Sequence, residues 1–550
     1  MTIYDRCFRV SIAFLLALGL SVSHSALAEP AHLHDHATVS PGQNIGTVDF
    51  RVSCDAAVRA DFDRALGLMH HMMYVQARSA FEAVAQADPE CAMAYWGIAT
   101  TLFQPFWGTR PNEEELQRGW RKIEQARKLE PATERERLLV EATGSFFREP
   151  ESADFWDRLH RWADGMATAY QAHPDDADTA ALYAIARLSV AQRRADERDA
   201  LHDEAEEILR GIWEQKPRHP GATHYSIHAT DVDGRAKNAL DMVEVYGDIA
   251  PEVPHALHMP SHIYVRLGDW DKVIDWNRRS ADAALRDSVN GAISHHYIHA
   301  IDYMMYAYLQ KGEDDQALAV FEEAMNQDRH QASFISAFHL ATLPARKAVE
   351  RREWEHATAL EPRTPDYLPW DASRWPEGIS WYARGLGGVQ TGDLGMVRDA
   401  EQQLAALRER AREDGDEHLA TYIEVDRRIL AGWIARAADE DQKAVRLMRS
   451  AAALERTVEK HPVTPGALLP PNEALGDLLM DLDRPTEALE AYRASDEIWP
   501  GRYNTLLGAA RAAHAAGDDT TAREYYGELL EIASDSRRAG VSEARRFLDV

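Results

Sequence analysis

The residues best suited to chemistry are five histidines in the middle of the chain: His224, His228, His255, His258 and His262. Positions 224 and 228 are four residues apart, as are 258 and 262, so the members of each pair share one face of a helix. The second pair follows the first by 34 residues, so the same arrangement recurs on two successive units of chain. Crowded neutral imidazoles offer lone pairs that one cation can accept together. The spacing therefore predicts a transition-metal site on a helical scaffold.

Further potential ligands continue this pattern toward the C-terminus. His299 and Asp302 lie one unit further along, with His295 and His296 just before them, and His339 lies in the unit after that. Because neighbouring helix axes are about 8–10 Å apart, imidazoles from adjacent helices can meet at one ion or two. The primary ligands that we predict are His224, His228, His258 and His262. The groups that we assign to a second ion, or to orienting the primary ligands, are His255, His299 and Asp302.

These residue types limit which metals could bind but do not identify the metal. All-nitrogen ligation suits copper or zinc, and also iron or nickel. Met259, Met304 and Met305 lie nearby and favour copper, although a methionine in a helix more often packs in a core. Neither histidine pair has a glutamate directly after its first histidine, which argues against a zincin mechanism. Because no nucleophile, general base or phosphate-binding loop can be assigned, the sequence leaves the question of catalysis open.

The scaffold is expected to be helical from Asp61 onward, because apolar residues recur at helical spacing and no alternating strand pattern occurs. The stretch LGDWDKVIDWNRRSA at 267–281 resembles the turn and second helix of the tetratricopeptide repeat (TPR) family. That family has a small residue at repeat position 20, which here falls on Ala77, Ala205, Ala239, Val273, Ala317, Ala357, Val397, Ala444, Ala488 and Ala522. Its frequent proline at position 32 falls on Pro89, Pro217, Pro251, Pro369 and Pro500. The resemblance implies an all-α solenoid of helix-turn-helix repeats.

The same resemblance implies where the histidines lie. In TPR proteins the first helix of each repeat lines a concave groove through positions 2, 5 and 9. This register puts the two histidine pairs at positions 5 and 9 of successive repeats, and His299 and Asp302 at positions 2 and 5 of the next. The predicted ligands would therefore form a patch on the concave wall.

Pro260 departs from an ordinary repeat. It falls inside a first helix, where a proline removes a backbone hydrogen bond. It either interrupts the helix between His258 and His262, or follows a short turn after which the helix begins near Ser261, with His255 and His258 on a loop. Both readings predict an irregular backbone among the ligands.

Export is expected on two grounds. Arg6 and Arg9 precede a mostly apolar run at 11–22 and an A-x-A sequence ending at Ala28, which is the pattern of a secretory signal peptide cleaved after Ala28. The stretches CAMAYWG at 91–97 and HALHMPSHIYVRLG at 255–268 also make the chain similar to a group of uncharacterised exported bacterial TPR proteins. That resemblance implies the fold and export and carries no activity. We therefore expect a periplasmic or secreted protein without a membrane span.

The chain is expected to follow a simple domain order. After cleavage, His32, His34 and His36 alternate in a polar stretch that either collects metal ions or is an inconsequential tail. The expected parts are a signal peptide at 1–28, a flexible histidine-containing segment at 29–60, N-terminal repeats at 61–218, central histidine-rich repeats at 219–360, and C-terminal repeats with a capping helix at 361–550.

The cysteines and the net charge indicate a disulfide and exclude some classes of partner. Cys54 and Cys91 are the two cysteines left in the mature chain, and in an oxidising compartment they are expected to form a disulfide. A thiolate site is the less favoured alternative, because neither cysteine has a CxxC partner. The formal net charge of -29, without a basic stripe, argues against nucleic acid or an anionic membrane as a partner.

One proline-rich segment, KHPVTPGALLPPNEALGDLL at 460–479, cannot be helical at its start. It is either a rigid loop that folds over the groove or a long connection between repeats. Two functions fit the whole sequence: an exported solenoid that binds copper or zinc, with a catalytic or metal-delivery role, and a non-enzymatic scaffold that grips a peptide or protein partner in its groove.

Overall fold

The computed structural model describes residues 44–105, 110–149, 154–192, 194, 196–286, 288–289 and 291–550. The predicted signal peptide and His32, His34 and His36 lie outside these residues. The described residues belong to one compact unit. Within the segment expected to be flexible, Ile45, Phe50 and Val52 are buried in the first hydrophobic core, so that expectation is wrong from residue 44 onward.

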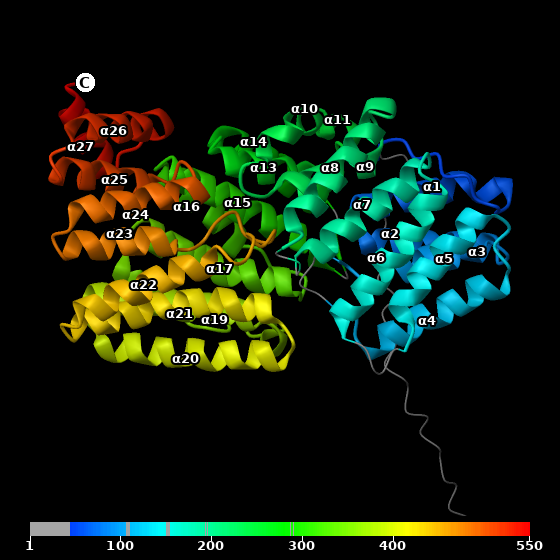
Figure 1. Ribbon diagram of the computed structural model, residues 1–550, viewed down its shortest axis with the longest axis horizontal. Coiled ribbons are helices and arrows are strands. Elements are labelled where there is room, and N and C mark those ends of the chain that lie inside the picture. Colours follow the sequence, from blue (N-terminus) through cyan, green and yellow to red (C-terminus); the bar gives the residue numbers. More distant parts are fainter. Residues whose placement is uncertain are drawn as a thin grey trace, which may run out of the picture. The chain divides into compact units, whose positions relative to one another are not determined.

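The N-terminal part consists of helices that succeed one another with short connections (Figure 1). Each helix packs on the next one in the chain, which is how amphipathic hairpins bury their apolar faces. A 3-10 helix at Ala56–Val58 comes first. The α-helices are α1 (Arg59–His70), α2 (Tyr74–Ala87), α3 (Ala92–Thr100), α4 (Glu113–Lys128), α5 (Glu134–Phe147), α6 (Phe155–Ala172), α7 (Ala177–Ala191) and α8 (Arg198–Gln215).

The central part carries the predicted ligands and is less regular. Its elements are α9 (Pro220–Thr230), a 3-10 helix (Ala236–Ala239), α10 (Leu240–Glu244), α11 (Tyr246–Ile249), α12 (Pro254–His258), α13 (Pro260–Leu267), α14 (Trp270–Ala284), α15 (His295–Gln310), α16 (Asp314–Met325), α17 (Phe334–Glu350) and α18 (Trp354–Thr358). Two short antiparallel strands, β1 (Ser288–Val289) and β2 (Ala292–Ile293), interrupt the series. They occupy an insertion between the repeats of α14 and α15.

The C-terminal part returns to long hairpins. After a 3-10 helix (Trp370–Ala372), its elements are α19 (Arg374–Thr391), α20 (Leu394–Glu413), α21 (Glu417–Ala437), α22 (Asp441–Glu455), α23 (Pro471–Asp481), α24 (Pro485–Ile498), α25 (Tyr503–Ala515), α26 (Asp519–Ala533) and α27 (Ala539–Leu548). Residues 456–470, between α22 and α23, form no helix and are called the covering segment below.

The repeat register predicted from sequence is visible in the packing. All ten residues at repeat position 20 are at most 1% exposed, from Ala77 in α2 to Ala522 in α26. Small side chains at these positions let the second helix of each hairpin approach its neighbours closely. The five prolines at position 32 all lie outside the helices. The prediction of an all-α solenoid of TPR-like helix pairs is confirmed.

A disulfide joins Cys54 to Cys91, as predicted. Cys54 precedes the first helix and Cys91 is the N-cap of α3, so the bond ties the N-terminal segment to the second hairpin. No thiolate is left at this pair to bind a metal.

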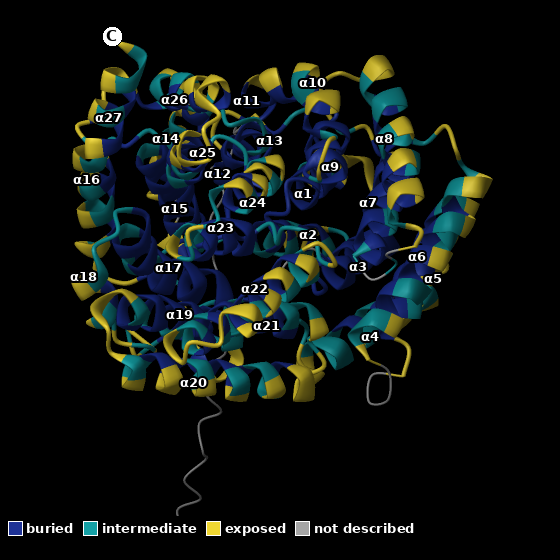
Figure 2. Cartoon of the chain, turned by 60° about the vertical axis from the view of Figure 1, so that its left-hand side comes forward, coloured by how far each residue is buried: buried dark blue, intermediate teal, exposed yellow. Residues whose placement is uncertain are grey.

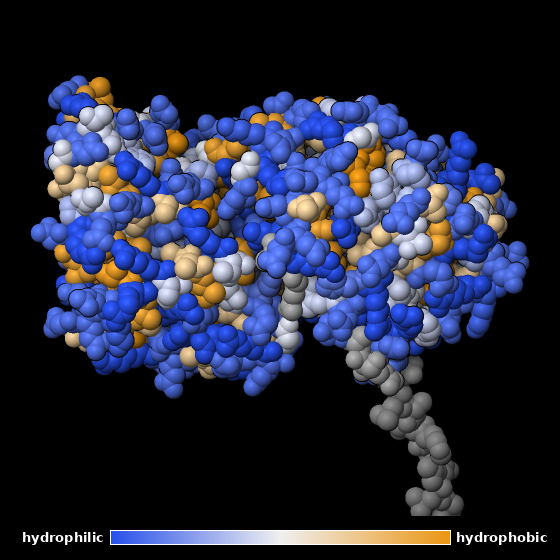
Figure 3. All heavy atoms as spheres, viewed as in Figure 1, coloured by the Kyte–Doolittle hydropathy of each residue, from blue (hydrophilic) through white to orange (hydrophobic). Residues whose placement is uncertain are grey.

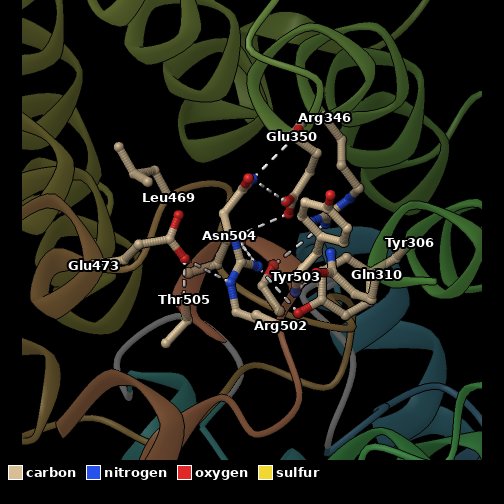
Figure 4. A network of polar contacts seen from close by, with 12 residues as sticks. Tyr306, Gln310, Arg346, Glu350, Leu469, Glu473, Arg502, Tyr503, Asn504 and Thr505 are labelled. Carbon is tan, nitrogen blue, oxygen red and sulfur yellow. Dashed lines mark hydrogen bonds and ion pairs between the residues drawn. The ribbon is translucent and has the colours of Figure 1, made fainter. Parts of the chain in front are cut away.

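A buried ion-pair network ties the C-terminal hairpins to the central helices (Figure 4). Arg502 bonds Glu350 of α17 at 3.0 Å and Glu473 of α23 at 3.1 Å, and it donates to the Tyr306 hydroxyl of α15 at 3.1 Å. Arg502 also donates to the Ala467 carbonyl oxygen of the covering segment. The network therefore fixes where the covering segment lies.

The outer surface on the face shown in Figure 3 is mostly hydrophilic, which agrees with the content of charged residues in the sequence. Small hydrophobic groups are scattered over this face. Among the described residues, no helix has both the length and the apolar character needed to cross a membrane.

Candidate metal centre

The backbone break at Pro260 decides how the central histidines are presented. Met259, between α12 and α13, keeps right-handed helical dihedrals (φ -53°, ψ -39°). The His262 amide donates to the Met259 carbonyl oxygen at 3.1 Å. Pro260 therefore interrupts the helix between His258 and His262, as the first of the two readings predicts. The loop reading is wrong, because His255 and His258 both lie in α12.

All seven predicted ligands are buried. The exposed fraction of His224, His228, His255, His258, His262, His299 and Asp302 is at most 7%. They come from α9, α12, α13 and α15, and α9 and α15 are mostly dark blue in Figure 2. The sequence predicts a patch on the concave wall of the groove, and the structure shows that these side chains are covered rather than exposed. The histidines do meet across successive repeats, but other parts of the chain cover them.

His258, His262 and His299 form the first group, here called centre A. One ligand nitrogen from each lies within 4.8 Å of the other two. The Nε2 atoms of His258 and His262 are 3.0 Å apart, and the His258 and His299 ring centroids are 4.1 Å apart. The sequence placed two of these residues among the primary ligands and His299 only in the supporting set.

Hydrogen bonds fix the tautomers of His258 and His262. The Asn277 amide nitrogen donates to the Val273 carbonyl oxygen, so its Oδ1 accepts from His258 Nδ1 at 2.7 Å. His262 Nδ1 donates to Asp231 Oδ2 at 2.8 Å. Both Nδ1 atoms carry protons, so both Nε2 atoms present lone pairs to each other across 3.0 Å. Facing lone pairs repel unless a proton or a metal cation lies between them.

A relay orients the third imidazole. Arg346 donates to Asp302 Oδ1 at 3.0 Å, and His339 Nδ1 donates to Asp302 Oδ2 at 3.1 Å. His339 Nε2 therefore accepts from His299 Nδ1 at 2.7 Å, which leaves the lone pair of His299 on Nε2. Asp302 thus acts through His339 and belongs to no ligand group of the described residues.

Asp231 is a functional residue that the sequence reasoning missed. It lies just beyond α9 and accepts from His262, Arg266 and Lys460. Burial alone would raise the pKa of Asp231, but the Lys460 and Arg266 charges and the His262 hydrogen bond outweigh it and hold the pKa below its usual range. The carboxylate therefore stays ionised and keeps His262 Nδ1 protonated. No spacing rule links positions 231 and 262, since they meet only in the fold.

The imidazoles of centre A are neutral at pH 7. Burial, and then the neighbouring His262, lower the pKa of His258 well below its usual value. Burial and the neighbouring His258 do the same to the pKa of His299. Neutral imidazoles keep the lone pairs that a metal needs.

His224, His228 and His255 form a second group, here called centre B, with ligand nitrogens within 4.8 Å of one another. The His224 ring centroid is 5.0 Å from those of both His228 and His255. His224 Nδ1 donates to the His70 carbonyl oxygen at 2.6 Å, and His224 Nε2 has no hydrogen-bond partner among the described residues. Burial lowers the pKa of His228 to about 3, with the nearby His262 as the next cause. His255 lies beside His258, with 6.3 Å between ring centroids, so the two centres adjoin.

The sequence analysis also missed a third buried group, which consists of His70, Asp178 and His219. Its hydrogen bonds differ from those of centres A and B. Asp178 Oδ1 accepts from His70 Nε2 at 2.9 Å and from His219 Nε2 at 3.2 Å. His70 Nδ1 accepts from the Tyr225 hydroxyl, and His219 Nδ1 accepts from the Ala222 amide. Every ring nitrogen is already used, so this group is structural. It holds the His70 backbone that orients His224.

The methionines do not identify the metal. Met259 lines the small pocket beside the histidines. Met304 and Met305 pack in a hydrophobic core with Ile298 and Ile301. Met304 and Met305 therefore do not favour copper, contrary to the expectation from sequence.

The covering segment closes both centres. Its residues Pro462 and Val463 line the same small pocket as His228, His255, His262 and His299. The Tyr303 hydroxyl donates to the Pro462 carbonyl oxygen at 2.9 Å, and Lys460 Nζ lies 2.9 Å from Asp231 Oδ2. The reading of the proline-rich segment as a loop folded over the site is confirmed.

Neither the protein-family models nor the curated proteins contain a match to this sequence. Among solved structures, the human IFIT1 dimer with m7Gppp-AAAA aligns over 81% of this chain and 90% of its own, at 12% identity and a TM-score of 0.39. Yeast Tom70 aligns over 90% of this chain and 96% of its own, at 10% identity and a TM-score of 0.30. At such low scores these likenesses carry no functional argument for this chain.

Proposed function

We propose that this protein is an exported TPR-type solenoid that holds a transition-metal ion, copper or zinc, at His258, His262 and His299. The observation that carries the proposal is the 3.0 Å separation of the His258 and His262 Nε2 atoms, both of which present lone pairs. Zn–N bonds of about 2.0–2.1 Å place two nitrogens of a tetrahedral site about 3.3 Å apart. The observed separation is close to this value.

A shared proton is the competing explanation for the short contact. Proton sharing would leave a positive charge in a buried site where several other imidazoles lie nearby. Burial and these neighbours lower the pKa values of the imidazoles, so a proton binds poorly there at pH 7. A metal cation forms strong bonds to all three nitrogens and offsets this cost.

The outer hydrogen bonds also support a metal site. Histidine ligands usually donate their second ring nitrogen to a carboxylate, a carbonyl oxygen or another acceptor. Here Asp231 accepts from His262, Asn277 accepts from His258, and the His339–Asp302 relay accepts from His299. Each ligand of centre A thus has a dedicated acceptor.

Three protein ligands leave a coordination position for water or a substrate, as in catalytic zinc sites. His262 and His299 line a small pocket that the covering segment closes. The contact between Lys460 and Asp231 helps to hold the covering segment against the site. This enclosure supports a resident ion rather than one in transit to another protein.

Centre B supports a second ion. It repeats the histidine pair of centre A one repeat earlier, and His224 Nε2 lacks a hydrogen-bond partner among the described residues. The alternative function, peptide binding in the groove, has no support at these repeats because the histidines are buried beneath the covering segment.

Elemental analysis of the mature chain tests the proposal. Positions 32–36 are deleted to remove adventitious binding by the N-terminal histidines, and the protein is purified without a histidine tag. The parent is expected to hold one copper or zinc ion per chain for each occupied centre, and His258→Ala/His262→Ala is expected to lose the ion of centre A. The matched control is His356→Ala/His514→Ala, because both of these histidines are exposed. A parent protein that stays metal-free after reconstitution would refute the proposal.

Export is tested separately. Mass spectrometry of the protein from the periplasmic fraction is expected to find Glu29 as the first residue. A full-length chain confined to the cytoplasm would contradict this part of the proposal.

A further inference from the structure

A cavity of about 200 Å³ lies beside the metal centres and has its own chemistry. Its walls come from α8, α13, α17, α19, α21, the end of α22, the start of α23, the end of α24 and the covering segment. It shares His461 with the small pocket at the histidines. Arg266, Arg346 and Lys460 of its lining also belong to the contacts that orient the ligands of centre A. Metal binding does not account for its aromatic residues or for Asp426 and Glu455.

One side of the cavity is an aromatic wall. Trp375 stacks on Tyr422, with 4.7 Å between ring centroids, and Phe338 lies 4.7 Å from Trp375. Trp499 adds a further ring, and Ile379 and Val425 are apolar neighbours. Such a surface suits the apolar body of a small molecule and the face of an organic cation.

The basic side chains that line the cavity already have acidic partners. Arg198 pairs with Glu459, and Arg346 pairs with Asp302. The remaining pairs are Arg266 with Asp231 and Asp233, Lys460 with Asp231, and Arg456 with Glu497. Each of these cations thus has at least one acidic partner among the described residues, although Arg346 Nη1 is itself buried without a hydrogen bond there.

Two carboxyl groups that line the cavity, those of Asp426 and Glu455, form no ion pair among the described residues. Within the described part of the chain, neither Asp426 nor Glu455 has a basic group within 4.0 Å. Trp499 Nε1 donates to Glu455 Oε1 at 3.1 Å, while Glu455 Oε2 is buried and has no hydrogen-bond partner among the described residues. Burial, and then the charge of Glu455, raise the pKa of Asp426 well above its usual value. Burial raises the pKa of Glu455 to about 7.

We infer that this cavity binds a small organic cation, with its ammonium group at Asp426 and Glu455 and its apolar or aromatic body against Trp375 and Tyr422. A cationic ligand supplies the positive charge that the two carboxyls lack. The aromatic wall selects an organic ammonium over an inorganic ion. This inference does not depend on a metal at centre A or centre B.

Calorimetry with three matched probes tests the inference on the mature, metal-stripped protein. The probes are 2-phenylethylamine, 2-phenylethanol and phenylacetate at pH 8, where Glu455 is mostly ionised. We expect the amine to bind at least tenfold more tightly than the alcohol, and the acid to bind most weakly. Equal affinities, or no binding of the amine, would overturn the inference.

Variants locate the site. Asp426→Asn/Glu455→Gln is expected to weaken amine binding at least tenfold and to leave alcohol binding unchanged. Asp439→Asn, at an exposed position, is the control and is expected to bind the amine as the parent does. Amine binding that survives the double substitution, or that appears only after metal is restored, would place the amine elsewhere and overturn the inference. Because the metal-stripped protein is used, failure here is distinct from failure of the metal proposal.

Discussion

His258 and His262 point their Nε2 atoms at each other across 3.0 Å, while Asn277 and Asp231 accept from the opposite ring nitrogens. This arrangement is expected to raise the affinity of the site for a metal ion. The acceptors fix which nitrogen of each ring carries its lone pair toward the centre.

Replacing Asn277 tests this role. Asn277→Leu keeps a similar volume but removes the acceptor for His258 Nδ1, so we expect metal affinity to fall about 10–100-fold. Competition with a chromophoric chelator measures the change. Asn326→Leu, on a surface turn, serves as the control and is expected to keep the parent affinity. An unchanged affinity in Asn277→Leu would show that the hydrogen bond does not tune the site.

Arg502 is expected to be essential for stability. Arg502→Leu leaves Glu350 and Glu473 buried without their cation, and removing one partner of such a network costs about 3–5 kcal/mol. Denaturant unfolding of the metal-free protein gives the free energy directly. Arg523→Leu, at a partly exposed ion pair, should change it by less than about 1 kcal/mol. Similar effects of the two substitutions would contradict the structural account.

The metal-free protein should lose stability as the pH falls. Burial lowers the pKa of His71 and His461 to about 4 and that of His228 to about 3. The unfolded chain takes up protons at these groups below about pH 6.5, whereas the folded chain does not. The contribution of these histidines to stability is therefore fully present above that pH and is lost as the pH falls toward 4.

Thermal melts of the metal-free protein between pH 8 and pH 5 check this expectation. Each of these histidines lowers the free energy of unfolding by at most about 2 kcal/mol at pH 5. Glu455 has the opposite effect on stability. Its pKa of about 7 in the folded chain is above that of an unfolded glutamate, so protonation at low pH stabilises the folded state. A melting temperature that rises on acidification would show that carboxyls, not histidines, dominate.

The disulfide should contribute measurably to stability. Cys54 and Cys91 are 37 residues apart, and closing a loop of that length stabilises a fold by about 4 kcal/mol in the chain-entropy model. Cys54→Ser/Cys91→Ser is therefore expected to unfold at a lower denaturant concentration than the parent. The parent in a reducing agent should behave like the variant. Equal unfolding curves for the oxidised parent and the variant would contradict the prediction.

The fold could be predicted from sequence because its signals are local and repeat. Ala205 and Ala239 are separated by one period, as are Ala488 and Ala522, and each is packed as its register requires. The histidine pairs were found for the same reason, since residues four apart share a helix face.

The assignment of ligands to centres could not be predicted. His299 joins His258 and His262, while His255 joins His224 and His228, and this choice depends on side-chain directions across several helices. Asp231 and Asn277 orient ligands from other elements, and no periodic pattern marks them. The proline cluster at 460–479 marked a non-helical loop, but the sequence could not decide between a cover over the groove and a plain connection, because the segment comes about 200 residues after the histidines in the chain.

The contact between Lys460 and Asp231 also bears on the order of assembly. These residues are 229 positions apart, and Asp231 is the acceptor that orients His262. Chain synthesis runs from the N-terminus, so all the histidines of both centres emerge long before Lys460 does. An order of folding that begins at the N-terminus would leave the ligands of centre A in place but uncovered until Lys460 reaches Asp231. Under the metal-binding proposal, that interval is when an ion would have access to the three nitrogens.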